Sequence, residues 1–268
     1  MGLSIPEFYR QNRREMLDFI NLYQRTYSNS CNSDQKIKGV VAPYGDYSYY
    51  LGSTISVFNP FWGNKELKSS SNVVLIFHTN RIKAPQALIL GGKKWETPLG
   101  EINGNPEFAY SMSKAIAEVK ISDLSVENEL PIKYILPLIR YYNVQNTNIV
   151  PVAVSDAVSG TSITNILDYL NKIPNTYFII CGNIVKSKIN LSSQPIIEGI
   201  VSSLVDRNIT KLGQLIQYTS FPNCFLGLIN FALNNDFVIT RNPEVDDYVF
   251  RIRSKRLLGA ISFMVKRP

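Results

Sequence analysis

Asn72-Val-Val-Leu-Ile-Phe77 is a continuous apolar run, and His78 follows it directly. A strand that is apolar without alternation is typical of a sheet covered on both faces, because neither face is left to water. Asn148-Ile-Val-Pro-Val-Ala-Val154 and Thr176–Cys181 have the same character, and Ile37–Ala42 is a shorter example. Pro151 has no N–H for a sheet hydrogen bond, so we expect its strand to lie at a sheet edge or to carry a bulge.

Helical patterns alternate with these strands. Met16, Phe19, Ile20 and Tyr23 recur at helical spacing, and further helices are expected within 106–119, 130–139, 161–170, 196–205 and 225–233. Alternating strands and helices favour an α/β fold of three layers, in which helices cover both faces of a mixed, largely parallel sheet. Without a repeat, a low-complexity segment or a linker-like break, we predict one domain over residues 1–268.

The composition excludes several classes of protein. At 45% hydrophobic and 18% charged residues, the chain can bury a core and is unlike a disordered protein. No apolar run reaches the ~18–20 residues that a membrane-spanning helix needs, and the first residues lack the pattern of a signal peptide. With three isolated Cys and no CxxC pair, we expect a soluble cytoplasmic protein that does not contact membranes. The single His excludes any site built from two or more histidines.

Polar side chains gather in the loops that follow the predicted strands. In open α/β sheets, ligands usually bind in the loops at the carboxyl ends of the strands. Three such loops are expected, over 43–52, 78–85 and 182–187, and they carry tyrosines, His78, Asn183 and Lys186. The sequence has no GxSxG nucleophile elbow and no GxxxxGK[ST] or GxGxxG phosphate loop. These loops are therefore polar without forming a familiar catalytic motif.

One segment resembles a known family closely. Trp95-Glu-Thr-Pro-Leu-Gly-Glu-Ile102 is similar to the WxTPLG segment of the MEMO family, the second component of the AmmeMemoRadiSam system. The other landmarks of the family follow in the same order, over about 6–265: Phe8-Tyr9, Val41-Ala-Pro43 with Tyr47, Ser125 with Glu127, Leu130 and Pro131, Asn223-Cys224 with Gly227, and Leu258-Gly-Ala260. The resemblance implies a fold like that of the class III extradiol dioxygenases.

The resemblance also implies where a metal site would lie, and this sequence departs from it there. Tyr44 stands where the family has its first loop His, and His78 keeps the second. The family's SSDxxH loop is replaced by Cys181-Gly-Asn-Ile-Val-Lys186, so that Asn183 stands for Asp, Val185 for a ligand and Lys186 for His. Leu124 replaces a further His. A site for iron or zinc needs about three imidazole, thiolate or carboxylate ligands, and a lysine ammonium repels a divalent cation.

We therefore predict no metal and no cofactor. In their place we expect a vestigial pocket formed by Tyr44, Asp46, Tyr47, His78, Leu124, Glu127, Asn183, Val185 and Lys186. A rescued metal site made of Asp46, Glu127 and His78 stays an alternative.

Three functions follow as hypotheses. In the first, the chain is a pseudoenzyme, a MEMO-like binding or scaffold subunit of a protein or nucleoprotein complex. In the second, it is a metal-free enzyme in which His78 is the general acid or base, Glu127 orients it and Lys186 binds an anion. In the third, it binds nucleic acid, since the net charge is +7 and a basic patch attracts phosphates. The patch would consist of Arg10, Arg13, Arg14, Arg251, Arg253, Lys255 and Arg256.

Overall fold

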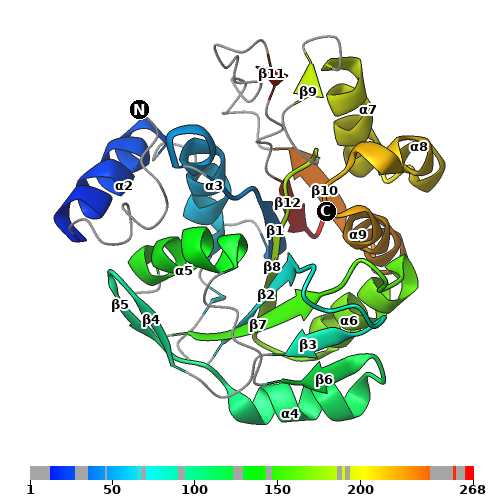
Figure 1. The fold of residues 1–268 in the computed structure, drawn as a ribbon, viewed down its shortest axis with the longest axis horizontal. Helices are drawn as coiled ribbons and strands as arrows, with labels where there is room; N and C mark the ends of the chain where they lie inside the picture. The colour runs from blue at the N-terminus through cyan, green and yellow to red at the C-terminus, as the bar shows by residue number, and fades with distance from the viewer. Residues whose placement is uncertain are drawn as a thin grey trace.

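An eight-stranded mixed sheet forms the centre of the molecule (Figure 1), with strand order β10-β12-β1-β8-β2-β7-β3-β6. The computed structural model describes residues 13–27, 36–45, 47–64, 66–67, 71–89, 94–122, 129–142, 147–185, 189–190, 194–241, 256–257 and 263–268. The strands of this sheet are β1 (Ile37–Ala42), β2 (Asn72–His78), β3 (Ala87–Ile89), β6 (Val119–Ile121), β7 (Asn148–Val154), β8 (Thr176–Cys181), β10 (Val238–Arg241) and β12 (Phe263–Lys266). Two small ribbons accompany it, made of β4 (Trp95–Thr97) with β5 (Gly100–Ile102) and of β9 (Ile189–Asn190) with β11 (Arg256–Leu257).

The four central strands β1, β8, β2 and β7 are parallel. Antiparallel pairing joins β12 to β1 and to β10 at one side, and β3 to β7 at the other. The apolar runs found in the sequence are these central strands. The prediction of an α/β fold around a mixed, largely parallel sheet is therefore confirmed.

Pro151 does not place its strand at an edge. β7 lies between β2 and β3, and Pro151 is in regular register with Leu75 of β2. The pairing of β7 with β3 covers only Val152 to Val154, so no hydrogen bond to β3 is required from Pro151. The prediction of an edge strand or a bulge was wrong because the pairing with β3 stops at Val152, so the missing N–H of Pro151 costs no hydrogen bond to that strand.

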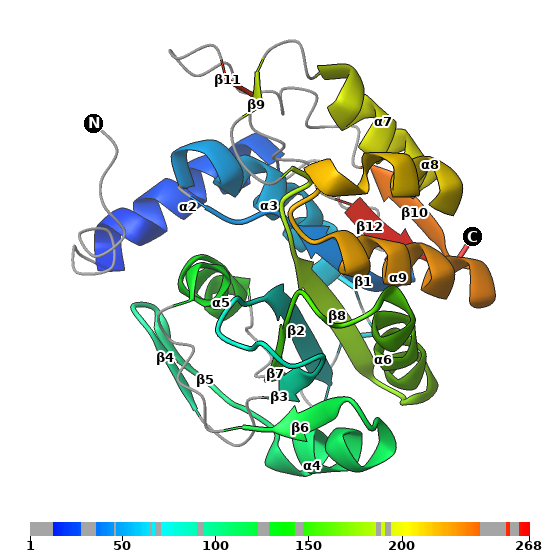
Figure 2. The ribbon, with the colours of Figure 1, turned by 45° about the vertical axis from the view of Figure 1, so that its right-hand side comes forward.

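Helices cover both faces of the sheet (Figure 2). On one face lie α2 (Arg13–Tyr27), α3 (Tyr47–Trp62) and α5 (Leu130–Tyr142). The other carries α4 (Pro106–Ala115), α6 (Gly160–Lys172), α7 (Gln194–Val205), α8 (Ile209–Leu215) and α9 (Pro222–Asn234), with a short 3-10 turn at Ile216–Tyr218. Alternate residues of β2 enter the two cores: Val74 and Ile76 face α6 and α9, whereas Leu75 and Phe77 face α3 and α5. Two buried faces explain why the run at 72–77 shows no alternation.

Helix α3 corrects the predicted loop at 43–52, because it begins at Tyr47. Its sequence has no charged residue, and residues such as Ile55, Val57 and Gly52 have low intrinsic helix propensity. Almost every side chain between Leu51 and Phe61 is buried. A helix buried on nearly all sides lacks the polar face that makes a helical period visible in sequence.

The segment that resembles the MEMO family is a tight hairpin. Trp95 pairs with Ile102 and Thr97 with Gly100, and the Thr97 hydroxyl donates to the Gly100 carbonyl at 2.8 Å. Gly100 has φ 121°, a conformation that glycine adopts without strain. Trp95, Leu99 and Ile102 are buried with the α5 face. In the described part of the chain, every helix is too short or too polar to cross a bilayer.

Candidate functional site

The carboxyl ends of the four parallel strands meet at one edge of the sheet. Ala42 of β1 and Phe77 of β2 both pair with Cys181 of β8, and His78 pairs with Val154 of β7. The loops that follow are thereby brought together, as the sequence predicted for three of them. The fourth, after Val154, was not considered in the sequence analysis, although the end of its strand was visible there.

Asn183 joins two of these loops. Its side-chain oxygen accepts a hydrogen bond from the Tyr44 backbone N–H at 2.9 Å, and its side-chain nitrogen donates to the Tyr44 carbonyl at 3.0 Å. The Ser220 hydroxyl, two residues before α9, donates to the Asn183 carbonyl. Both ends of the Asn183 amide are therefore engaged with backbone. Asn183 positions the Tyr44 loop.

Tyr44 itself is a neutral, half-buried phenol. Burial raises the pKa of the Tyr44 phenol to about 12, with smaller contributions from nearby Cys181, Tyr50 and Glu129. The crevice between Tyr44, Leu51 and Tyr134 has no room for a water molecule. Tyr47 is buried, and its hydroxyl donates to the Tyr134 carbonyl at 2.6 Å. Tyr44 and Tyr47 thus pack against α5 and leave no open pocket at this point.

His78 lies beside Asp156, which belongs to the loop after β7. Nε2 of His78 is 2.8 Å from Oδ1 of Asp156, within ion-pair distance but without the alignment of a hydrogen bond. The Asp156 side chain is 75% exposed and that of His78 24% exposed, so water screens the pair. The His78 ring also packs edge-on against Phe221, with centroids 5.8 Å apart.

A second polar network begins at Glu129, the residue before α5. Oε1 of Glu129 accepts a hydrogen bond from the Thr79 hydroxyl at 3.0 Å and lies 2.9 Å from Nε of Arg81. Thr79 is fixed by its own backbone N–H, which donates to the Val154 carbonyl at 2.9 Å. Glu129 and Arg81 were visible as charged residues in sequence. Their pairing depends on α5 crossing the end of β2, which no local pattern indicates.

Both described cysteines are buried and remain thiols. Burial raises the pKa of the Cys181 thiol well above its usual range, and the same cause raises the pKa of Cys224. The thiolate is the form that binds a metal or acts as a nucleophile. Cys181 and Cys224 therefore serve as small core residues at the ends of β8 and α9.

The remaining predicted site residues are placed only in part. Val185 is buried in the core on the α6 and α9 side. Arg13 and Arg14 are exposed in the first turn of α2, and Arg256 pairs with Asn190 in the β9–β11 ribbon. The other predicted residues lie outside the described residues: Asp46, Leu124, Glu127, Lys186, Arg10, Arg251, Arg253 and Lys255. Their roles, and the continuity of the basic patch, stay predictions.

Comparison with known proteins identifies the family. Residues 6–189 match the family described as Memo-like protein. The chain belongs to this family. The match confirms the resemblance seen at the 95–102 hairpin and covers the four parallel strands.

Two known proteins are similar to this Memo-like chain, one in sequence and one in fold. A MEMO1 family protein of Thermoplasma volcanium, TV1383, is 26% identical over 229 residues, which are 83% of this chain and 80% of that protein. The crystal structure of the uncharacterized protein JW3007 from Escherichia coli K12 is similar in fold, with a TM-score of 0.50 and 12% identity. It covers 87% of this chain and 100% of that one. At this identity the second likeness shows the fold alone.

The described side chains at the family's ligand positions do not suit a divalent metal ion. Tyr44 is a neutral phenol, both ends of the Asn183 amide bind backbone, and Val185 is a buried hydrocarbon. His78 supplies one imidazole, whereas structural and catalytic sites use about three or four ligands. Among the described residues, no group of three or more His, Cys, Asp and Glu side chains could hold a metal ion.

Proposed function

We propose that this chain is a non-catalytic Memo-like protein, a binding or scaffold subunit of a protein or nucleoprotein complex. The observation that carries the proposal is the pair of hydrogen bonds between the Asn183 side chain and the Tyr44 backbone, one accepted and one donated by Asn183. It joins two loops at which the resemblance to the family implies metal ligands. In this proposal the hydrogen bonds between Asn183 and Tyr44 hold the two loops together in place of a shared metal ion.

The packing around this link supports the same proposal. The crevice behind Tyr44 is closed to water, and Cys181 beneath it stays protonated because burial raises the pKa of its thiol. A loop edge that keeps its geometry without a metal can still present a fixed surface to a partner. In this proposal the task of the fold is binding, and the residues at the ligand positions of the family pattern have a structural role.

Metal content tests the first half of the proposal. Protein purified without added metal, and then incubated with Fe²⁺, Zn²⁺ or Cu²⁺ and desalted, is expected to hold far less than one equivalent. The matched control is the double variant Tyr44→His and Lys186→His, which returns two side chains of the family pattern. Stoichiometric metal in the wild type that disappears in His78→Gln would overturn the proposal.

Affinity purification from the native organism tests the second half. The tagged wild-type chain, with Asn183 intact, is expected to bring down a partner reproducibly. Metal analysis of the same sample should find no metal in stoichiometric amount. A chain that is monomeric and alone under these conditions counts against a scaffold role.

A second candidate function rests on His78 and Asp156. An imidazole within 2.8 Å of a carboxylate at a strand end is an arrangement used for general acid–base catalysis. This would be a metal-free enzyme, with His78 as the general acid or base and Asp156 as the carboxylate beside it. Turnover of small ester or phosphoester substrates that is lost in both His78→Gln and Asp156→Asn would favour it, and turnover that survives both changes would not.

A further inference from the structure

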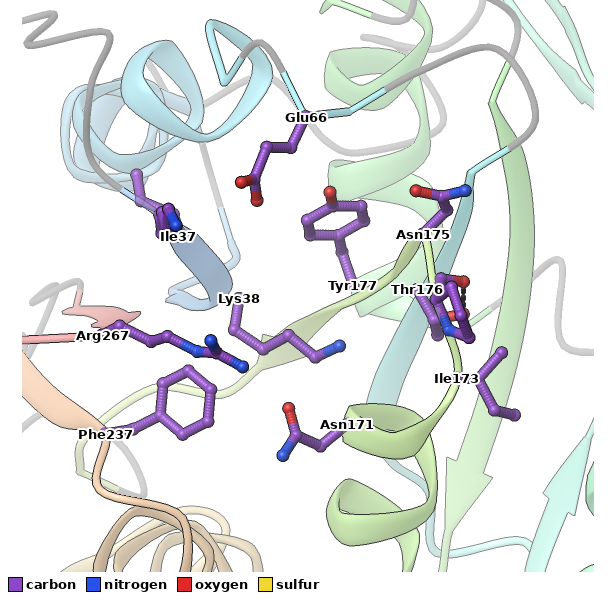
Figure 3. A pocket seen from close by; sticks show the side chains of 12 residues that line it. Ile37, Lys38, Glu66, Asn171, Ile173, Asn175, Thr176, Tyr177, Phe237 and Arg267 are labelled. Carbon is purple, nitrogen blue, oxygen red and sulfur yellow. Dashed lines mark hydrogen bonds between the residues drawn. The ribbon is translucent and has the colours of Figure 1, made fainter.

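A separate cavity lies at the opposite edge of the sheet, beside the amino ends of β1 and β8 (Figure 3). It has a volume of about 500 Å³, and its charged lining residues are Lys36, Lys38, Glu66 and Arg267. The two ends of a six-residue strand lie roughly 17 Å apart. The cavity shares no residue with the loops of Tyr44, His78 and Asn183.

The lining of this cavity is strongly cationic. Lys36, Lys38 and Arg267 face a single carboxylate, Glu66, which leaves an excess of two positive charges. Within the described residues, no ion pair involves any of these three cations. The cavity therefore holds positive charge that the described part of the protein does not neutralise.

Lys38 makes two contacts inside the cavity. Its Nζ donates to the Leu170 carbonyl at 3.1 Å and lies 5.8 Å from the centroid of the Tyr177 ring. Burial, together with the positive charge of Arg267, lowers the pKa of Lys38 to about 8, and Glu66 offsets this only in part. The ammonium is still charged at neutral pH. It keeps donors beyond the one used by Leu170, since an ammonium has three.

Arg267 is held on the other side of the cavity. Its backbone N–H donates to the Lys36 carbonyl at 3.3 Å, and its guanidinium lies 5.9 Å from the centroid of the Phe237 ring. Stacking on a ring leaves the in-plane N–H groups of a guanidinium free to bind an anion. Asn171 donates one of its two side-chain N–H groups to Asn235 at 3.0 Å and keeps the other.

The aromatic rings of the lining are already used. Phe237 stacks on Phe231 with centroids 5.2 Å apart, and Arg267 lies over the same Phe237 ring. Lys38 lies over the ring of Tyr177. A nucleobase would need a free ring face for stacking, so recognition in this cavity falls on charge.

We propose that this cavity binds a small phosphate monoester, with Lys38 and Arg267 as its cationic ligands. A phosphate monoester carries a charge of about −1.5 to −2 at neutral pH and offers three acceptor oxygens. That charge matches the excess of two positive charges in the lining, whereas a monocarboxylate would leave one unmatched. The volume lies in the lower part of the range of small-molecule pockets, roughly 300–1,000 Å³.

Isothermal titration of the full chain tests this site. The probes are glycerol 3-phosphate and inorganic phosphate, with glycerol as the uncharged control. Arg267→Gln is expected to raise the dissociation constant about tenfold or more, because a charge-assisted hydrogen bond is lost. Lys120→Gln on β6 removes one exposed positive charge away from the cavity, and it should change the constant less than about twofold.

Arg267 is exposed, so its variant should fold, and circular dichroism checks this. Lys38→Met keeps the buried stem of the side chain and should weaken binding as strongly as Arg267→Gln. Binding of both probes with equal affinity supports the proposal. Tighter binding of glycerol 3-phosphate than of inorganic phosphate supports it too, and shows that the organic part of the ligand contributes. Absence of binding for both probes at millimolar concentration overturns it, as does equal weakening by Arg267→Gln and Lys120→Gln. Neither result bears on the proposed function of the loops that hold Tyr44, His78 and Asn183, because the two sites share no residue.

Discussion

Replacement of Asn183 by alanine gives the most direct test of the link between the loops after β1 and β8. The change removes the acceptor for the Tyr44 N–H and the donor to the Tyr44 carbonyl, at 2.9 Å and 3.0 Å. It leaves the N–H and the carbonyl of Tyr44, both in partly buried hydrogen bonds, without their partners. The variant should therefore lose more than the net value of two hydrogen bonds.

The expected loss can be worked from these contacts. A net hydrogen bond is worth about 1 kcal/mol, and a buried polar group left unpaired costs about 1–3 kcal/mol. Asn183 is half-buried, so water can reach part of the exposed backbone, and the lower part of this range applies. We expect the free energy of unfolding to fall by about 2–3 kcal/mol, a large share of the roughly 5–15 kcal/mol that a typical protein has.

Urea denaturation followed by tryptophan fluorescence measures this loss. The matched control is Asn80→Ala, the same change at an exposed Asn in the loop after β2, which should alter stability by less than about 0.5 kcal/mol. If Asn183→Ala unfolds at the same urea concentration as Asn80→Ala, the link is not structural. The main support for a binding role without metal would then be gone.

Three further predictions follow from the packing and the pKa values. In Gly227→Ala the new Cβ would lie 2.6 Å from the Gly160 carbonyl and 2.6 Å from Ile163 Cβ, so chemical denaturation should show a loss of about 1–3 kcal/mol, whereas Gly213→Ala in α8, with nothing within 4 Å, should gain up to about 1 kcal/mol. The pKa of Lys38 is lowered to about 8 from its ordinary value of 10.5. At a pH between these two values, Lys38 is protonated in the unfolded chain and has lost its proton in the native protein. The stability of the wild type relative to Lys38→Met should therefore rise with pH across this interval. Urea titrations at several pH values test this, and a constant difference between the two proteins would contradict it. Iodoacetamide should leave Cys181 and Cys224 unmodified in the native protein and alkylate both in denaturant, since burial raises the pKa of each thiol; peptide mapping that finds either one labelled in the native state would refute this.

Sequence patterns predicted the central strands because burial on both faces leaves a local mark, the unbroken apolar run at 72–77. They failed at the helix that begins at Tyr47, since a helix buried on nearly all sides has no polar stripe. They failed also at Pro151, where the outcome depended on the length of a neighbouring strand. Tyr44, His78 and Asn183 lie at the same sheet edge, where the loops after the strands were expected to meet, whereas the vestigial pocket stays a prediction. Their partners were not predicted.

By itself the sequence determined the family and the layered α/β fold of this protein. The 95–102 hairpin carries the family likeness within eight neighbouring residues. The burial of the central strands is visible in the sequence as short apolar runs. Only the tertiary structure decided which side chains meet: Asn183 with the Tyr44 backbone, His78 with Asp156, and Lys38 with Arg267 around one cavity. The physical reason is that these contacts depend on strand order and register, which bring together residues from distant parts of the chain.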